Sequence, residues 1–557
     1  MFKIDPAQDS FDCYIKEKNY YVDKTEFIYE YLEESFESKI MFTRPRRFGK
    51  TMIMTMFRDF LDNTQKSEEL FKGLKIMEHK DLVNQYMNKY PVLFLSLKDV
   101  KGSSFEDIYD LFRNKVCEVY RDHAYLLSSE YLDDDDKEMF SELKKGEASK
   151  STTILGVSFL CEMLKKHWDK QVFVIIDEYD VPMANAVGTP AYEDVLDMIQ
   201  KMLSSVCKTN SNVKAVMISG CLYTIKNSSY TGLNNIRPKT ILTNRYAMYF
   251  GFTDEEVKQI LTAAGYSGKY DEVKKTYDGY IFGNTHIYNP WDVMNYIAYL
   301  DDNGGISPIE PQLFWANTSE TRLNLIHGFL GRTADALEGF EKLLTGQQFV
   351  KVINENVPYH QLHDAGNNLW AGLLETGYLT KAEKQGRSGT LTLCIPNIEV
   401  MEVFRQEVSN FFEKHVDIAS VNLFVDALWN SNAKGSQDSL DLILQATVSY
   451  LHAYHEYTYH LVLDGFFTGK GYRTYSEIEA GFGRSDLIIK DLERNRALVL
   501  ELKHAEKEKD LQKGLKEACD QIKAKKYESN LVYDGYTEIH KYGMAFFDKQ
   551  CLIKELQ

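Results

Sequence analysis

An α/β fold built around a parallel sheet is predicted for the N-terminal half of this chain, because short apolar runs alternate there with longer helical patterns. The runs typical of strands are KIMFTR at 39–44, PVLFLSL at 91–97, VFVIID at 172–177 and VKAVMISG at 213–220. A helical pattern at 51–61 follows the first of them. Strands that alternate with helices in this way usually lie parallel in one sheet.

The patterns along the 557 residues predict three domains, since a domain usually contains roughly 100–200 residues. Residues 1–252 contain the predicted parallel sheet. Thr253 and Glu256 form a capping box that opens a mainly helical region at 253–445, which we interpret as a lid and linker. Residues 446–557 form a separate α/β unit.

This last unit begins with two strand patterns, DLIIK at 486–490 and ALVLELK at 497–503. A charged helix at about 510–526 follows them. Two further β runs are predicted, NLVY at 530–533 and YGMAFF at 542–547.

Composition indicates an ordinary globular protein, with 44% hydrophobic and 26% charged residues. No apolar run approaches the roughly 18 residues that a membrane span requires, and the N-terminus lacks the pattern of a secretion signal. We therefore expect a cytoplasmic protein without a membrane segment. The eight cysteines form no CxxC pair, so we expect reduced thiols and neither a zinc site nor a disulfide framework.

The net charge of -17 gives no overall attraction for nucleic acid, whose binding depends on phosphate neutralisation. From Leu461 to the end, 17 Lys and Arg residues balance 17 Asp and Glu residues. Nucleic acid, with DNA expected, would therefore have to be bound by a local patch. The acidic run at 133–136 is interpreted as solvated surface.

A candidate phosphate-binding loop follows the first predicted strand, with the sequence RPRRFGKT at 44–51. At such a loop, backbone N–H groups at a helix N-terminus cradle phosphate, a lysine reaches the β and γ oxygens, and a hydroxyl ligates Mg²⁺. Gly49, Lys50 and Thr51 fit these roles. Arg44 replaces the first glycine of the G-x-x-x-x-G-K-[ST] pattern, so the loop is a variant.

Two other strand ends carry residues that suit the same site. Asp177 and Glu178 end the buried run VFVIID. In a P-loop fold the aspartate would hold magnesium and the glutamate would polarise the attacking water. Ser219 ends another strand, where a polar side chain can sense the γ-phosphate, although Ser-Gly also ends strands for local reasons.

The residues Arg46, Arg47 and Phe48 complete the candidate nucleotide-binding loop. The two arginines, like Arg44, add positive charge that would contact phosphate or a neighbouring subunit. Action across an interface would imply a homo-oligomer, and a solvated surface is the alternative interpretation.

A second candidate site lies on the predicted hairpin of the last unit. If the turn is centred between Glu493 and Arg494, paired residue numbers sum to 987 and Asp486 lies opposite Glu501. Like charges that face each other destabilise a strand pair, and a divalent cation between them would remove the repulsion. Lys503 points to the same face and would steady the nucleophilic water or the phosphate. A solvated strand pair is the alternative.

Segments along nearly the whole chain resemble the hallmarks of bacterial AAA-ATPase-like proteins that carry a PD-(D/E)XK nuclease domain. They include FTRPRRFGKT, VFVIIDEYDVP, YFGFTDEEV, TYDGYIFG, FWANTS and LLETGYLT, in that order. The resemblance implies a P-loop NTPase-type parallel sheet, a helical lid and a C-terminal restriction-endonuclease-like α/β domain. It also implies that RPRRFGK is the usual form of the loop and that Asp23, Lys24 and Thr25 lie near the nucleotide.

In the last unit, Asp486, Glu501 and Lys503 resemble the Asp and Glu-x-Lys core of the PD-(D/E)XK pattern. Glu479 resembles the acid that this family carries on its first helix, and Gln521 resembles its helix-borne polar residue. Tyr527 lies near Gln521 in the sequence, and His460 and Arg484 are candidate substrate contacts for which packing or surface ion pairs are the alternative.

These observations predict an enzyme that binds and hydrolyses ATP with Mg²⁺ and that hydrolyses nucleic-acid phosphodiesters with Mg²⁺ or Mn²⁺. One alternative is a nucleotide-dependent switch whose nuclease fold binds without cutting. Another is an ATPase whose C-terminal unit is only a scaffold.

Overall fold

The computed structural model describes two compact units. It describes all residues except 1, 35, 209, 223–232, 234, 309–310, 316–338, 340–341, 344–345, 354–366, 384–389, 416, 448–455, 477–478, 481–482, 485–486, 526–527 and 557. The first unit comprises Met1–Asn317, Lys351–Leu391 and Pro396–Ile398. The second unit comprises Thr318–Val350, Thr392–Ile395 and Glu399–Gln557.

A five-stranded parallel sheet is the centre of the first unit. Its strands are β1 (Lys39–Thr43), β2 (Val92–Ser96), β3 (Val172–Asp177), β4 (Val213–Gly220) and β5 (Arg237–Lys239), in the order β2-β3-β4-β1-β5. The four predicted strands are confirmed. Strand β5 was not predicted, because the sequence Arg-Pro-Lys has no apolar signal and forms a strand only by pairing with β1. All six residues of β3 are buried, as expected inside a parallel sheet.

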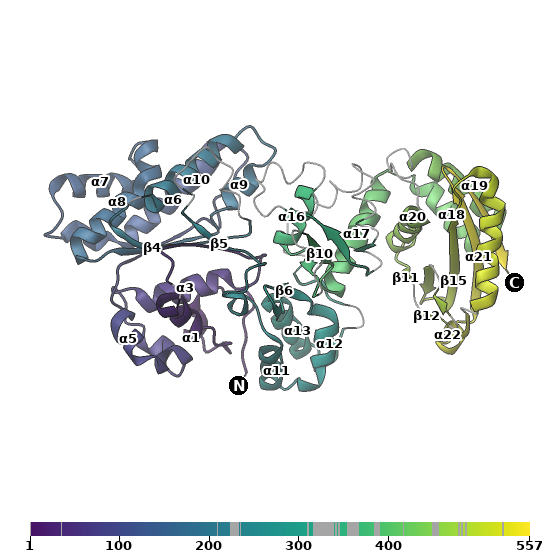
Figure 1. Ribbon diagram of the computed structural model, residues 1–557, viewed down its shortest axis with the longest axis horizontal. Helices are drawn as coiled ribbons and strands as arrows, with labels where there is room; N and C mark the ends of the chain where they lie inside the picture. The colour runs from purple at the N-terminus through teal and green to yellow at the C-terminus, as the bar shows by residue number, and fades with distance from the viewer. Residues whose placement is uncertain are drawn as a thin grey trace. The chain divides into compact units, whose positions relative to one another are not determined.

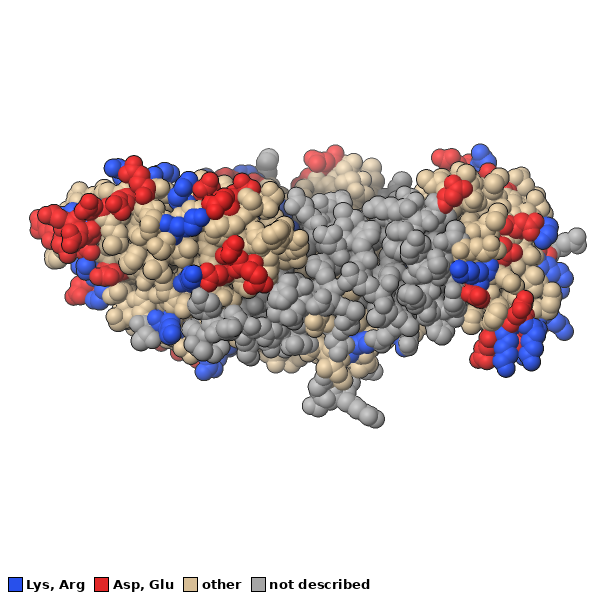
Figure 2. Space-filling view, turned by 90° about the horizontal axis from the view of Figure 1, so that it is seen from above, with Lys and Arg blue, Asp and Glu red and all other residues tan. Residues whose placement is uncertain are grey.

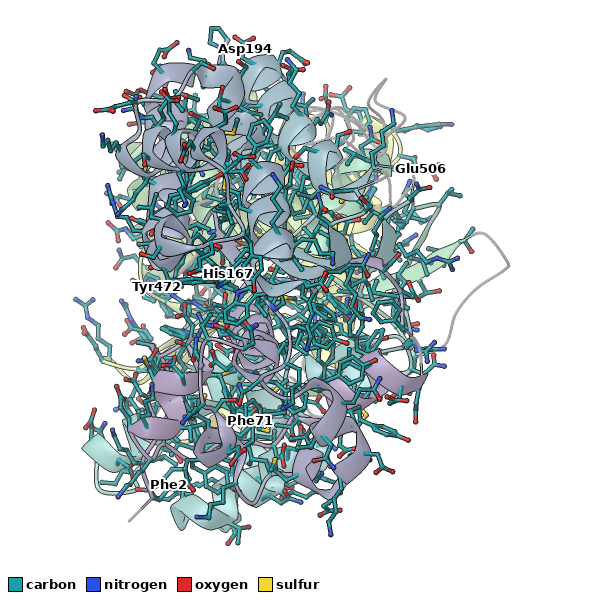
Figure 3. The ribbon with its side chains drawn as sticks, turned by 90° about the vertical axis from the view of Figure 1, so that its left-hand side faces the viewer. Phe2, Phe71, His167, Asp194, Tyr472 and Glu506 are labelled. Carbon is teal, nitrogen blue, oxygen red and sulfur yellow. The ribbon has the colours of Figure 1, made fainter. Side chains whose placement is uncertain are left out.

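Helices cover both faces of this sheet (Figure 1). On one side lie α1 (Phe11–Lys16), α2 (Glu26–Tyr29), η1 (Glu30–Glu34), α3 (Lys50–Leu61), α4 (Glu68–Phe71), η2 (Lys75–Glu78) and α5 (Lys80–Tyr86). On the other lie α6 (Phe105–Asp122), η3 (Ala124–Ser128), α7 (Asp134–Lys145), α8 (Lys150–Trp168), α9 (Val181–Ala186) and α10 (Tyr192–Cys207). In Figure 3, Phe71 marks the first layer and Asp194 of α10 the second. An aromatic core that includes Phe27, Phe42 and Phe57 packs between the first helix layer and the sheet.

The acidic run at 133–136 lies on the surface, as predicted. Asp133 caps α7 and forms a capping box with Asp136. Carboxylates at a helix N-terminus are stabilised by the helix dipole. Figure 2 shows acidic side chains gathered at the left-hand end of the molecule, where α7 lies in Figure 1.

The rest of the first unit follows the predicted capping box, in which the Thr253 N–H donates to Glu256 Oε2 at 2.7 Å. The short helix η5 (Ala247–Tyr249) precedes the box. The elements after it are α11 (Asp254–Ala264), η6 (Ser267–Lys269), α12 (Tyr270–Tyr277), β6 (Tyr280–Phe282), β7 (Thr285–Ile287), α13 (Pro290–Asp302), α16 (Asn367–Thr376) and β9 (Thr380–Lys381). The hairpin β6-β7 interrupts a region that was predicted to be mainly helical. Gly283 makes its turn possible, because its φ of 54° is a left-handed conformation.

A second five-stranded sheet forms the core of the second unit. Its strands are β11 (Arg473–Ser476), β14 (Leu487–Asp491), β15 (Arg496–His504), β16 (Glu538–Phe547) and β17 (Gln550–Leu556), in that order. Only β15 and β16 run parallel. The pair β12 (Glu479–Ala480) and β13 (Gly483–Arg484) is separate, and the remaining strands are β8 (Phe349–Lys351) and β10 (Leu391–Cys394).

Helix α21 (Leu511–Lys525) packs closely on one face of this sheet. A Cβ atom on Gly543 of β16 would lie 2.7 Å from Cys519 Sγ of α21, so glycine permits the approach. On the other face, Tyr542 donates to Leu428 O of α18. The other helices are η10 (Glu508–Asp510), α17 (Ile398–His415), α18 (Ile418–Trp429), α19 (Ala433–Thr447), α20 (Glu456–Gly469) and α22 (Glu528–Tyr533).

The predicted strand NLVY at 530–533 is wrong, because these residues end helix α22. Leu531 is buried, whereas Val532 and Tyr533 are 61% and 93% exposed. One buried apolar side chain per turn suits a short helix, and the run is too short for periodicity to distinguish the two structures.

The eight cysteines all lie within the described residues, and five of them are buried. None of the helices in the described residues combines the length and apolarity that crossing a membrane requires.

Gly279→Ala should destabilise the first unit strongly. Gly279 has a φ of 120°, and a Cβ atom there would lie 1.7 Å from Pro396 O. Backbone strain together with this clash should lower the free energy of unfolding by about 3 kcal/mol or more. Chemical denaturation measures the effect, with Gly268→Ala as the control because a Cβ atom there meets nothing within 4 Å. Equal stability of the two variants would contradict the packing described for Gly279.

Candidate functional site

The candidate phosphate-binding loop leaves β1 and turns into α3. Arg47 and Gly49 have φ values of 69° and 78°, so the backbone is left-handed at both. Glycine adopts this conformation without cost, whereas an arginine pays about 1–2 kcal/mol. Among the described residues, no backbone carbonyl accepts from the N–H groups of Arg47 or Gly49. These donors are therefore available to an anion at the start of α3.

Three predicted site residues meet at the carboxyl ends of β1, β3 and β4. Thr51 Oγ1 donates to Asp177 Oδ2 at 2.8 Å, and the Ser219 hydroxyl donates to Asp177 Oδ1. Asp177 is fully buried. Burial raises the pKa of Asp177, and the hydrogen bonds from Ser219 and Thr51 oppose that rise. The carboxylate therefore joins the loop helix to two neighbouring strands.

The Lys50 ammonium lies inside the loop. Its Nζ atom donates to Arg44 O at 3.0 Å and to Pro45 O at 2.9 Å. It also lies 3.8 Å from Cys221 Sγ. Loop carbonyls thus satisfy the ammonium at the place where phosphate oxygens would bind in a P-loop.

Glu178 follows Asp177 in a left-handed conformation, with a φ of 52°. Its N–H donates to Ser219 Oγ at 3.3 Å. Burial raises the pKa of Glu178, and the nearby Lys50 opposes that rise. The sequence did not single out Asp180, whose Oδ2 accepts from the N–H groups of Cys221 and Leu222. The second aspartate of IDEYD was the available signal.

Arg44 does not project into the loop. Its guanidinium is fully buried, donates to Lys239 O at 2.6 Å and lies over the rings of Phe250 and Phe282. Burial lowers the pKa of Arg44 to about 9. Arg44 has no positive φ, so replacement of the usual first glycine causes no backbone strain.

The other predicted loop residues lie against later parts of the first unit. The Arg46 carbonyl accepts from Trp315 Nε1 at 3.1 Å. The Arg47 guanidinium carbon lies 3.9 Å from the centre of the Trp291 ring. The Phe48 ring is buried, with ring centres of Tyr280 and Phe282 at 5.0 Å, so it anchors the loop in the core.

The segment Asp23-Lys24-Thr25 was expected near the nucleotide. The described contacts of these residues lie elsewhere. Lys24 Nζ donates to Glu256 at 2.6 Å, Asp23 Oδ2 accepts from the Lys75 N–H, and Thr25 Oγ1 donates to Asp23. These bonds tie the segment to η2 and α11.

Lys98, which the sequence did not indicate, lies beside the acidic strand end. Ser96 pairs with Asp177 in the sheet, and the Leu97 N–H donates to Asp177 O at 2.9 Å. Lys98 Nζ is 2.5 Å from Asp9 Oδ2. Lys98 is thus a further cation at this edge of the sheet.

In the second unit, the predicted hairpin register is confirmed for every described pair, from Leu487 opposite Leu500 to Asp491 opposite Arg496. Glu501 is fully buried, and Lys503 Nζ lies 3.4 Å from its Oε1 atom. Asp486, the predicted partner of Glu501, lies outside the described residues, as does Tyr527.

The other predicted residues of this unit lie on several elements. Glu479 lies in β12 and not in a helix, and its side chain, like that of Arg484, is outside the described part of the structure. Gln521 lies on α21. His460 is buried in α20, which favours the packing interpretation. A buried acid on α20 that the sequence did not single out is Asp464, only 6% exposed, and its position in the apolar pattern LVLDGFF was the available signal.

Within the described residues, no group of three or more His, Cys, Asp or Glu side chains is placed to hold a metal ion. The two residues predicted to ligate magnesium in the first unit, Thr51 and Asp177, are hydrogen-bonded to each other. The metal site predicted in the second unit includes Asp486, which lies outside the described residues.

A loop between a parallel strand and a helix, facing an acidic strand end, defines the first unit as a P-loop NTPase-type domain. Residues 7–229 match the family described as "Predicted AAA-ATPase", and residues 454–556 match the PD-(D/E)XK nuclease superfamily. The chain therefore carries an AAA-ATPase-like domain and a PD-(D/E)XK nuclease superfamily domain, and the resemblance inferred from its sequence is confirmed.

One similar curated protein is the "Uncharacterized protein in vnfD 5'region" of Azotobacter chroococcum mcd 1. It is 26% identical over 278 residues, which are 49% of this chain and 48% of that protein. The chain thus matches about half the length of this relative.

Proposed function

We propose that the first unit binds and hydrolyses MgATP. The observation that carries this proposal is the hydrogen-bonded group of Thr51, Asp177 and Ser219 beside Lys50. The Thr51 hydroxyl and the Asp177 carboxylate suit magnesium, because both are oxygen ligands and they already lie 2.8 Å apart. Magnesium bound there would neutralise charge on the β and γ phosphates.

The protein's own groups have separate roles in this proposal. Lys50 leaves the carbonyls of Arg44 and Pro45 and binds phosphate oxygens. Glu178 orients the attacking water and accepts its proton, a role that suits a carboxylate whose pKa burial has raised. Ser219 holds Asp177 and reports on the γ-phosphate. Arg46 and Arg47 add positive charge near the phosphates.

We further propose that the C-terminal domain hydrolyses nucleic-acid phosphodiesters, with DNA as the expected substrate. Asp486 and Glu501 would hold Mg²⁺ or Mn²⁺, which activates water and neutralises phosphate charge. The buried Glu501 beside Lys503 supports this role, because a buried carboxylate is retained where a cation can pair with it. Lys503 would steady the phosphate, with Glu479 and Gln521 assisting.

A second candidate function is a nucleotide-dependent switch whose C-terminal domain binds nucleic acid without cutting. The charge of that region favours it, since 17 basic residues are balanced by 17 acidic ones from Leu461 onward. A polyanion must be held before it is cut. In either case, residues 253–445 would act as lid and transmitter between domains 1–252 and 446–557.

Lys50→Ala should weaken MgATP binding by about 100-fold or more, because charged hydrogen bonds to phosphate each contribute about 1.5–3 kcal/mol. Isothermal titration calorimetry measures the affinity. Lys72→Ala is the control, since Lys72 pairs with Glu69 in the described part of the chain and its side chain is 73% exposed. Unchanged affinity of Lys50→Ala would mean that nucleotide binds elsewhere.

Asp486→Ala and Lys503→Ala should each reduce plasmid cleavage in Mg²⁺ or Mn²⁺ by about 100-fold or more, and chelation with EDTA should stop it. Lys513→Ala is a suitable control, since its side chain is 77% exposed on α21. Equal nicking by the wild type and both site variants would refute the nuclease proposal and leave the switch.

A further inference from the structure

The phosphate-binding loop is held from outside the sheet domain at four consecutive positions. Each of the residues 45–48 contacts a different later segment of the first unit. The contacts are Pro45 with Gly377, Arg46 with Trp315, Arg47 with Trp291, and Phe48 with Tyr280 and Phe282. The first of these is close, because a Cβ atom on Gly377 would lie 2.9 Å from Pro45 Cβ. The segments belong to the part of the first unit that includes β6 and α13 in Figure 1.

Two tryptophans connect these contacts into a closed ring. Trp315 Nε1 donates to Arg46 O at 3.1 Å, and Trp291 Nε1 donates to Phe314 O, next to Trp315, at 3.0 Å. The Arg47 guanidinium then lies on the face of the Trp291 ring. The closed set of contacts thus runs from Arg46 to Trp315, from the neighbouring Phe314 to Trp291, and from Trp291 back to Arg47. Trp315 itself is buried, and its hydrogen bond to Arg46 is partly buried.

The closed set of contacts through Trp291 and Trp315 sets the direction of the peptide group between Arg46 and Arg47. In a trans peptide the C=O and the following N–H point in opposite directions. Trp315 fixes the Arg46 carbonyl, so the Arg47 N–H must point away from Trp315. That N–H is one of the loop N–H groups that donate to no described backbone carbonyl. The Trp291 ring also contacts the side chain of Arg47. The Arg47 backbone is left-handed, a conformation that an arginine rarely adopts.

We propose that Trp291 and Trp315 are positioning residues that hold the phosphate loop in its nucleotide-binding shape and sense its occupancy. The proposal rests on the nucleotide binding proposed above for the same loop. Coupling of two sites is reciprocal. If the tryptophans improve phosphate binding, then bound phosphate must stabilise the tryptophan contacts by the same factor. The region beyond the sheet would thus respond to nucleotide through these two side chains.

Trp315→Phe and Trp291→Leu test the proposal. Trp315→Phe removes the indole N–H together with one of the two fused rings, and Trp291→Leu removes the aromatic face under Arg47. Each should weaken binding of a MgATP analogue about tenfold, which corresponds to about 1.4 kcal/mol. Trp291→Phe should recover most of the affinity, because it restores an aromatic face. Trp168→Phe is the control, because it also removes an indole hydrogen bond, the one from Trp168 Nε1 at the end of α8 to the Tyr125 hydroxyl.

Hydrogen exchange without nucleotide gives an independent readout. The amides of residues 46–51 should exchange faster in Trp315→Phe than in the wild type, and Trp168→Phe should leave them unchanged. Unchanged exchange in Trp315→Phe would overturn the proposal. Wild-type affinity in both Trp315→Phe and Trp291→Leu would also overturn it. If the wild type binds no nucleotide, the proposed ATPase function fails, and the exchange experiment still decides whether the tryptophans hold the loop.

Discussion

The structure of the first unit depends on how a fully buried carboxylate, Asp177, is satisfied. A buried charge is costly unless hydrogen bonds replace the lost water. Thr51 and Ser219 supply those bonds from α3 and β4, and the Asp177 backbone bonds to β2 through the Leu97 N–H. Three separate segments are therefore fixed at one point. The same geometry gathers the oxygen ligands that a magnesium ion beside a triphosphate requires.

The phosphate-binding loop beside Asp177 is held both by its own backbone and core packing and by later segments of the first unit. Gly49 and Arg47 adopt left-handed backbone, and the side chains of Arg44 and Phe48 turn into the core instead of toward a ligand. Arg44 thus acts as an anchor of the loop, although its sequence position suggested a phosphate contact. A loop whose shape depends on distant contacts can transmit its occupancy to them, which an isolated glycine-rich loop cannot do.

The sequence predicted the parts of the fold that local pattern determines. Apolar runs located β1 to β4, and the turn at 493–494 gave the hairpin register of β14 and β15 correctly. The strand prediction for NLVY was wrong because a run of only four residues suits a helix as well as a strand. The bond between Trp315 and Arg46 joins residues 269 positions apart, and no local pattern encodes such a contact. Tertiary packing also decided that Arg44 and Phe48 point inward.

The most direct test of the account is a crystal structure with Mg²⁺ and a non-hydrolysable ATP analogue. The account predicts that Lys50 Nζ leaves the Arg44 and Pro45 carbonyls for the β and γ phosphates and that Thr51 ligates magnesium near Asp177. An analogue bound away from this loop, with Lys50 still on the two carbonyls, would contradict it.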